Sequence, residues 1–202
     1  MLEHATAENS NRVETAHLVQ LFDSDGSLVE AVAAFFAEGL RRNETMLAVM
    51  DEERWYSVAM RLGAAGLPID EALRCGRMTV RSAAHTLKKF MRPDGPDPRL
   101  FAASVGTLVS GLAAWGRPIR IYGEMVNVLA AQGEYAAAHE LEEFWNTLGM
   151  QKELKLFCGY SAAHFGDPIH AEALRRICAS HTEVLSSPDD VLGSFLVRAR
   201  RA

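Results

Sequence analysis

Short, mainly apolar runs alternate with longer amphipathic stretches along most of the 202-residue chain. The runs have the length and composition of buried strands, and they occupy five segments: 17–22, 45–51, 78–83, 118–125 and 153–160. The stretches between them repeat apolar residues every three or four positions, which predicts helices. Parallel neighbouring strands need a crossover, so the alternation predicts an α/β protein: an open, mainly parallel sheet with helices on both faces, in three layers.

The composition fits a single globular domain. Hydrophobic residues make up 49% of the chain, which is enough for a full core. Residues 1–14 are polar and are expected to be disordered or flexible, whereas 15–185 are expected to form the folded domain. The tail, 186–202, has apolar residues at helical spacing and arginines near its end. It is predicted to be a helix that either packs on its own domain or docks on a partner.

The chain carries a formal net charge of −5, which gives no basic footprint of the kind that binds nucleic acid. We therefore expect a protein or small-molecule partner and no direct contact with nucleic acid. The three cysteines, Cys75, Cys158 and Cys178, are far apart and in no CxxC spacing, which favours a reducing compartment over a structural zinc site. No apolar run has the length of a membrane span. These features predict a cytoplasmic protein that does not enter a membrane.

The turn "FDSDGSLVE" (22–30) joins the first strand to the first helix, where many α/β proteins bind a nucleotide phosphate. A phosphate loop needs glycines, a lysine and a Ser or Thr for magnesium. This turn has one glycine, no lysine, and Asp23 and Asp25, whose charges would repel phosphate. Ser27 and Glu30 have the spacing of a capping box for the helix that follows. Two interpretations stay open: helix capping alone, or a former nucleotide site that now binds something neutral.

Ligands of such sheets bind beyond the carboxyl ends of the strands. Glu124 directly follows an apolar strand, in the position of the acidic residue that holds magnesium in nucleotide hydrolases. Its alternative role is structural, as a partner of a neighbouring turn or of Arg120. Strand-end side chains are expected to converge on one crevice, with aromatic rings and a thiol as apolar walls and carboxylates as polar anchors. The candidate ligand-binding residues are Phe22, Asp23, Ser24, Tyr122, Glu124, Cys158 and Tyr160.

The seven histidines are scattered, and none shows the HxxxH or HExxH spacing of metal ligands on a helix, so no metal site is expected. His17 and His181 are expected to be structural or exposed, and are only weak candidates for the ligand site. Glu142 and Glu143, beside Trp145 on a predicted helix, are expected to form a solvated acidic edge. The sequence has no complete nucleophile-elbow motif of the G-x-S-x-G type. Neither a catalytic residue nor a cofactor is predicted.

An ordered set of segments resembles the MEDS domain, the methanogen/methylotroph DcmR sensory domain. The resemblance spans roughly 15–185 and depends on the order and spacing of the set, since no single motif is specific. The segments are "HLVQLFDSDGSLVEAVAAFFAEGL", "GRMTVRSA", "PIRIYGEMVNVLAAQGE", "HELEEFWNTL", "LKLFCGYSAAHF" and "ICASHTEV".

The resemblance implies a fold related to the RecA/KaiC-like ATPases without a functional phosphate loop, in agreement with the acidic turn. It also implies a sensory role, because the family is proposed to sense small hydrocarbon derivatives. Family members are often joined to DNA-binding, kinase or anti-sigma output modules. This chain has no recognisable output module, so its signal is expected to pass to a separate regulatory protein (a kinase, a sigma or anti-sigma factor, or a repressor) or through a homo-oligomer.

Three functions stay open at this point. The first is a non-enzymatic sensory domain that binds a small ligand and acts in transcriptional or two-component type regulation. The second is a degenerate ATPase-like protein that binds nucleotide through Glu124. The third is a pure interaction module with a closed crevice. The first is the preferred hypothesis, and a response to Mg–ATP separates it from the second.

Overall fold

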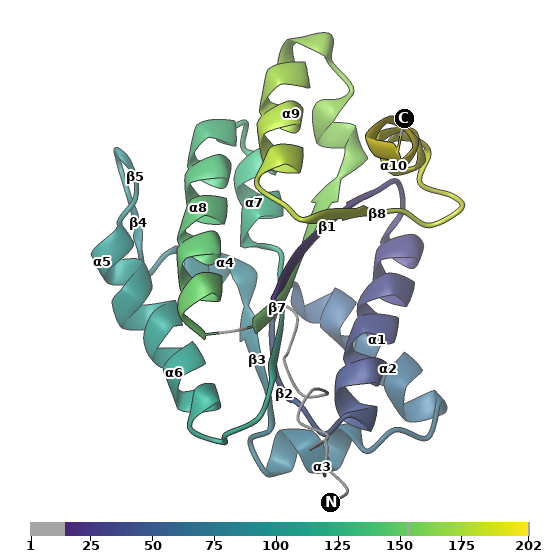
Figure 1. Cartoon of the computed structure of the whole chain (residues 1–202), viewed down its shortest axis with the longest axis vertical. Helices are drawn as coiled ribbons and strands as arrows, with labels where there is room; N and C mark the ends of the chain where they lie inside the picture. Colours follow the sequence, from purple (N-terminus) through teal and green to yellow (C-terminus); the bar gives the residue numbers. More distant parts are fainter. Residues whose placement is uncertain (1–14, 153, 202) are drawn as a thin grey trace, which may run out of the picture.

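A computed structural model describes residues 15–152 and 154–201, so the predicted flexible segment 1–14 lies outside the described residues. The centre of the molecule is a six-stranded sheet in the order β3-β2-β6-β7-β1-β8, in which every neighbouring pair is parallel (Figure 1). Its strands are β1 (Ala16–Phe22), β2 (Thr45–Met50), β3 (Met78–Ser82), β6 (Ile119–Gly123), β7 (Leu154–Ser161) and β8 (Glu183–Leu185). The predicted α/β class with a parallel sheet is confirmed.

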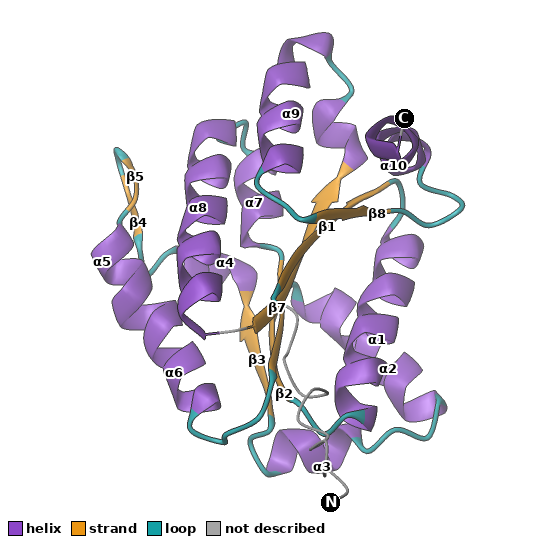
Figure 2. Cartoon of the chain, in the orientation of Figure 1, coloured by secondary structure: helices purple, strands orange, loops and turns teal. Residues whose placement is uncertain are grey.

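Helices cover both faces of this sheet, which completes the three predicted layers (Figure 2). One face is covered by α1 (Asp25–Arg41), α2 (Glu52–Ala64) and α3 (Ile69–Arg74). The other is covered by α4 (Ala83–Leu87), α5 (Pro98–Phe101), the π-helical turn η1 (Ala102–Gly106), α6 (Thr107–Ala113), α7 (Met125–Ala131), α8 (Tyr135–Lys152) and α9 (Ala171–Ala179). The more specific kinship with RecA and KaiC stays a prediction.

Two helices begin at the carboxyl ends of neighbouring strands because a polar residue caps each one. Ser24 is extended and its hydroxyl accepts from the Ser27 N–H at 3.2 Å, so α1 begins at Asp25. The capping box predicted for Ser27 and Glu30 is therefore wrong by one turn. Asp51 caps α2 through the N–H groups of the two residues that follow Glu52, as its position after an apolar strand predicts.

Two features of the structure are not predicted by the pattern of apolar residues. A sixth strand, β8, is only three residues long and begins with an exposed Glu183, so it does not read as an apolar run. The proline-rich region around 91–98 forms a short hairpin of β4 (Met91–Arg92) and β5 (Gly95–Pro96).

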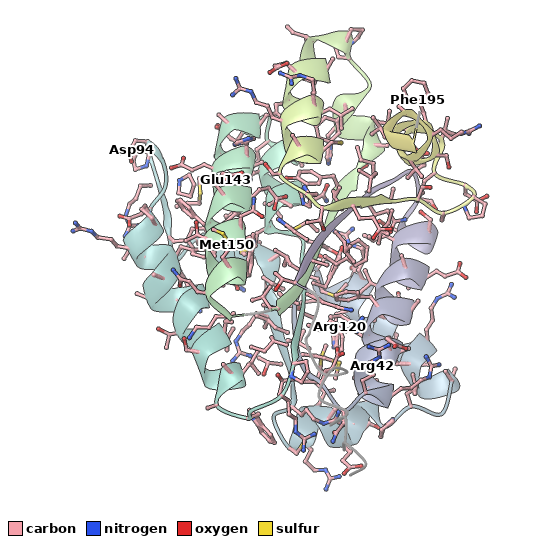
Figure 3. All side chains as sticks on the ribbon, viewed as in Figure 1. Arg42, Asp94, Arg120, Glu143, Met150 and Phe195 are labelled. Carbon is pink, nitrogen blue, oxygen red and sulfur yellow. The ribbon has the colours of Figure 1, made fainter. Side chains whose placement is uncertain are left out.

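The predicted C-terminal helix is present as α10 (Val191–Arg201) and lies at the β8 edge of the sheet (Figure 1). Leu192 and Leu196 are partly buried against the core, whereas Phe195 is 64% exposed and points to the outer edge of the molecule (Figure 3). The helix thus packs on its own domain and still presents apolar surface. Within the part of the chain that the structure describes, no helix is long and apolar enough to cross a membrane.

A close approach of β7 to the Tyr122 side chain of β6 and to α1 requires glycine at position 159. A Cβ built on Gly159 would lie 2.7 Å from Tyr122 Oη and 3.1 Å from Leu28 Cδ1. We expect Gly159→Ala to lower the free energy of unfolding by about 1–3 kcal/mol through overpacking. The control is Gly149→Ala, whose Cβ would meet only Leu154 Cδ1 at 3.9 Å. Urea denaturation measures both, and an equal midpoint for the two variants would contradict this account.

Candidate functional site

The turn after β1 surrounds a carboxylate that the chain itself supplies. Asp190 is fully buried, and its Oδ1 accepts from the Asp23 N–H at 3.1 Å and from the Ser27 hydroxyl at 2.8 Å. Its Oδ2 accepts from Gln20 Nε2 at 2.6 Å and from the Ser187 N–H at 2.9 Å. These donors surround the strand–helix turn at which α/β proteins bind phosphates. The N–H and O–H groups that could bind an external anion therefore bind the carboxylate of Asp190 instead.

Asp190 stays ionised in this position. Burial alone would raise its pKa, but the hydrogen bonds from Ser187, Gln20, Ser27 and Asp23 together lower it. Directly after Asp190, the Val191 N–H at the start of α10 donates to Asp23 Oδ2 at 2.6 Å. Asp190 thus accepts from the backbone of Asp23, Asp23 accepts from the backbone of Val191, and together they attach α10 to the end of β1.

Glu124 is held by a separate set of donors. Arg54 donates from Nε to Oε1 at 3.0 Å and from its terminal nitrogen to Oε2 at 2.8 Å, and the Tyr122 hydroxyl donates to Oε1 at 3.0 Å. The pKa of Tyr122 is raised, first by burial and then by the Glu124 charge. The alternative partner Arg120 is wrong, because that guanidinium is buried beside α1 and pairs with Glu44 at 2.6 Å (Figure 3).

A polar cavity of about 460 Å³ lies next to this pair, between the starts of α1 and α2. Acidic groups and two arginines dominate its lining, and Arg54 is bonded to both Glu124 and Asp25. The lining residues are Asp25, Gly26, Val29, Asp51, Glu53, Arg54, Ser57 and Arg61. Three carboxylates around the cavity disfavour a triphosphate.

We expect Mg–ATP to leave the melting temperature of the protein unchanged. The backbone N–H of Asp23, in the turn after β1, already donates to Asp190. The Arg54 side chain, which could contact phosphate, is bonded to Glu124. Differential scanning fluorimetry with and without Mg–ATP measures this, with Glu124→Gln as the diagnostic variant. A rise in melting temperature that disappears in Glu124→Gln would instead support the degenerate-ATPase alternative.

On the opposite face of the sheet lies a group that we call the buried polar cluster: His17, Glu142, Cys158 and His181. All four residues are buried, and their ligand-type atoms lie within 4.8 Å of one another. His17 Nε2 is 3.2 Å from Glu142 Oε2 and 3.4 Å from Cys158 Sγ. His181 Nε2 is 3.4 Å from Glu142 Oε1, to which the Tyr160 hydroxyl also donates at 2.8 Å. These side-chain types can hold a transition metal ion.

The protonation of the cluster follows from burial and from Glu142. Burial would raise the pKa of Glu142, but His181 and His17 together lower it, so the carboxylate is ionised. Burial and then the Glu142 charge raise the pKa values of Cys158 and Tyr160. The thiol and the phenol are therefore protonated at neutral pH, and Cys158 Sγ donates to Glu142 Oε2 at 3.4 Å.

The structure divides the predicted site residues instead of gathering them in one crevice. Successive side chains of a strand point to opposite faces, so Cys158 and Tyr160 face α8 while Tyr122 and Glu124 lie on the α1 side. Phe22 packs in the core beside α1, Asp23 binds α10 and Ser24 caps α1. The expectation of one shared crevice is wrong, and the ligand-binding role of each residue stays a prediction.

Sequence reasoning missed three of the groups at the centre of these sites. Glu142 was expected on a solvated edge but is fully buried. It shares helical spacing with Ala138 and Trp145, which lie four residues before it and three after it, and this was the available signal. Gln20 and Asp190 gave no such signal, since their contact joins residues far apart in sequence.

A third site lies between α1 and the segment that connects β8 to α10. Its cavity, about 610 Å³, is mainly apolar and is lined by Gln20, Ser27, Glu30, Ala31, Ala34, Phe35, Phe157, Leu185, Ser186, Ser187, Pro188 and Asp189. We call it the Gln20–Ser187 pocket. Gln20 Oε1 and Ser187 Oγ are buried there and have no hydrogen-bond partner among residues 15–152 and 154–201. The oxygen and nitrogen of the Gln20 amide cannot be exchanged by a flip of the side chain, because Nε2 already donates to Asp190.

A protein-family model described as "MEDS: MEthanogen/methylotroph, DcmR Sensory domain" matches residues 16–182. The chain belongs to the MEDS family. This confirms the resemblance on which the expected sensory role depends, because MEDS is a family of sensory domains. Among curated proteins, no significant match to the chain is found.

The MEDS match and the sites overlap to different extents. The matched residues include the whole buried polar cluster, from His17 to His181. They end before Ser187, Asp190 and α10. The Gln20–Ser187 pocket therefore lies at the junction between the MEDS domain and the C-terminal segment, with walls from both.

Proposed function

We propose that this MEDS domain is a non-enzymatic sensor that binds a small ligand in the Gln20–Ser187 pocket and signals to a separate regulatory protein. The observation that carries the proposal is the pair of buried, unpartnered polar atoms, Gln20 Oε1 and Ser187 Oγ, in a mainly apolar pocket. Buried polar atoms are nearly always hydrogen-bonded. Ligand pockets combine apolar walls with a few convergent polar groups of this kind.

The pocket defines the chemistry of the ligand. An amide oxygen accepts hydrogen bonds, so Gln20 Oε1 selects a ligand with an N–H or O–H group. Phe35 and Phe157 offer apolar surface to the rest of the molecule. Glu30 and Asp189 are exposed lining residues, and their charges favour a neutral or cationic ligand over an anion. A short alcohol or alkylamine, which is a small hydrocarbon derivative, meets these requirements.

A ligand in this pocket would couple the MEDS domain to α10. Phe157 belongs to the sheet and Ser187 belongs to the C-terminal segment, so a ligand that touches both binds better when the segment is docked. The segment leads directly into α10, where Val191 and Phe195 are exposed apolar residues that a partner could contact. We propose that the partner is a kinase, a sigma or anti-sigma factor, or a repressor, and that both proteins are cytoplasmic.

The proposal is non-enzymatic because of the groups that line the pocket. A carboxamide such as Gln20 is not a general base at neutral pH, and Ser187 Oγ has no hydrogen bond to an activating base among the described residues. These groups can recognise a hydrogen-bonding ligand but do not activate it.

A thermal-shift screen tests the pocket. The probes are propanol, propylamine and trimethylamine, since binding to the native state raises the melting temperature by an amount set by ligand excess over the dissociation constant. We expect at least one probe to stabilise the wild-type chain and to lose its effect in Ala34→Phe, which places a ring at the pocket wall. Ala136→Phe makes the same change at an exposed position of α8 and should keep the response. Stabilisation of all three proteins alike, or of none, would contradict the proposal.

A further inference from the structure

We infer that the buried polar cluster binds a divalent transition metal ion, with zinc as the favoured ion. Two imidazoles, a thiol and a carboxylate are the side chains that bind zinc in proteins. Here they are His17, His181, Cys158 and Glu142, and all four lie within the described part of the chain. The site lies on the face of the sheet opposite the Gln20–Ser187 pocket, so the inference goes beyond the proposed function and does not depend on it.

The distances between the four donors suit a tetrahedral ion. Zinc–ligand bonds of about 2.0–2.3 Å imply tetrahedron edges of roughly 3.3–3.8 Å. His17 Nε2 lies 3.2 Å from Glu142 Oε2 and 3.4 Å from Cys158 Sγ, and Cys158 Sγ lies 3.4 Å from Glu142 Oε2. His181 Nε2 completes the set at 3.4 Å from Glu142 Oε1. A small shift of these side chains would bring all four donors to bonding distance of one central ion.

The outer hydrogen bonds orient both imidazoles for metal binding. His17 Nδ1 is 2.7 Å from Asn146 Oδ1, and His181 Nδ1 is 2.6 Å from the Ile177 carbonyl oxygen. Both partners are acceptors, since the Asn146 amide nitrogen donates elsewhere, to the Ser180 carbonyl at 3.2 Å. Each Nδ1 therefore carries the hydrogen, and in the neutral ring each Nε2 directs its lone pair into the cluster. Metal-bound histidines characteristically have this arrangement.

The elements that supply the donors indicate what the ion would do. His17 comes from β1, Glu142 from α8 and Cys158 from β7, and His181 lies between α9 and β8. A site with four protein ligands and no exposed side chain is closed to substrate, as structural zinc sites are. The ion would join four separate elements and hold β1 and β8 against α8.

Binding must release the thiol proton of Cys158, and with it the Nε2 proton of any imidazole that donates to Glu142 in the metal-free protein. The Cys158 thiol is protonated in the absence of metal and donates to Glu142. On binding, the S–H bond breaks, the sulfur forms its bond to the ion as a thiolate, and the proton passes to solvent. The oxidation state of the sulfur and of the ion does not change.

Metal content and a spectroscopic probe test the inference. Full-length protein produced in zinc-supplemented medium should contain one zinc per chain, measured by mass spectrometry of the metal. Cys158→Ser should weaken zinc binding by at least about tenfold, as changes at metal sites do. Cys75→Ser, the same substitution at an exposed cysteine, should keep the full metal content. Equal metal content in both variants would overturn the inference.

Cobalt keeps the inference testable if Cys158→Ser does not fold. Wild-type protein stripped of metal with a chelator and titrated with Co(II) should show the visible bands of tetrahedral cobalt and a thiolate-to-cobalt charge-transfer band. His17→Gln should lose the tetrahedral bands with its circular dichroism unchanged. Wild-type protein that purifies without metal, or that shows no charge-transfer band with Co(II), would overturn the inference.

Discussion

Glu142→Ala should lower the free energy of unfolding by about 3–5 kcal/mol, because it removes the one anion from a fully buried set of donors. The substitution leaves the Tyr160 hydroxyl without its acceptor at 2.8 Å and the imidazoles of His17 and His181 without their carboxylate. Each buried polar group that loses its partner costs about 1–3 kcal/mol. Urea denaturation in the presence of a chelator measures the effect without any contribution from metal.

The matched control for this variant is Glu143→Ala, one residue further along α8. Glu143 is exposed and accepts from Asn146 and Ser180 at the surface, so its loss should cost less than about 1 kcal/mol. Two variants with equal unfolding free energies would contradict the central position of Glu142.

The contribution of Glu142 to the free energy of unfolding should also depend on pH. The pKa of its carboxyl is lowered from 4.5 in the folded chain. The folded state therefore binds fewer protons than the unfolded state below that value, and the contribution of Glu142 is complete above pH 4.5 and is lost as the pH falls further. In metal-free protein, the stability difference between wild type and Glu142→Ala should narrow in acid. A difference that stays constant down to the acid limit of folding would contradict the assignment.

Asp190→Ala should have the second-largest effect, about 2–4 kcal/mol, since it removes one acceptor from several buried donors at once. Gln20 Nε2, the Ser27 hydroxyl and the N–H groups of Asp23 and Ser187 all donate to this carboxylate. Those donors belong to β1, α1 and the C-terminal segment, so the variant should also release α10 from the end of the sheet.

Limited proteolysis and hydrogen exchange of 183–201 distinguish release of α10 from general destabilisation. In Asp190→Ala we expect faster exchange in this segment than in the central strands β6 and β7. The control Asp189→Ala changes the exposed neighbour and should leave exchange in the segment as it is in the wild-type chain. Equal exchange in the two variants would contradict the attachment of α10 by Asp190.

Much of the fold could be predicted from the sequence because its longer buried strands are short, mainly apolar runs. That pattern located β1, β2, β3, β6 and β7, and it implied the helices between them. It failed for β8, whose three residues are too short to show a period. Helix starts were found where the cap follows directly after an apolar strand, as at Asp51, and were misplaced where two serines compete, as at Ser24 and Ser27.

The sites were less predictable because they are built from contacts between distant residues. His17 and His181 carry no metal-ligand spacing in sequence, yet their ring centroids lie 4.0 Å apart. The single-crevice expectation failed for a geometric reason, since it ignored which face of the sheet each strand-end side chain occupies. The charges of Asp23 and Asp25 argued against a bound phosphate at the turn after β1. They did not reveal that the Asp190 carboxylate accepts the hydrogen bond of this turn.

Hydrogen exchange of the full chain with a stabilising probe tests the central claim most directly. The proposed ligand lies between the MEDS domain and the segment that carries α10. Saturation with whichever of propanol, propylamine or trimethylamine raises the melting temperature most should therefore slow exchange in 183–201 and in the first turns of α1. Protection confined to other elements, or stabilisation with no change in 183–201, would contradict a sensor that signals through α10.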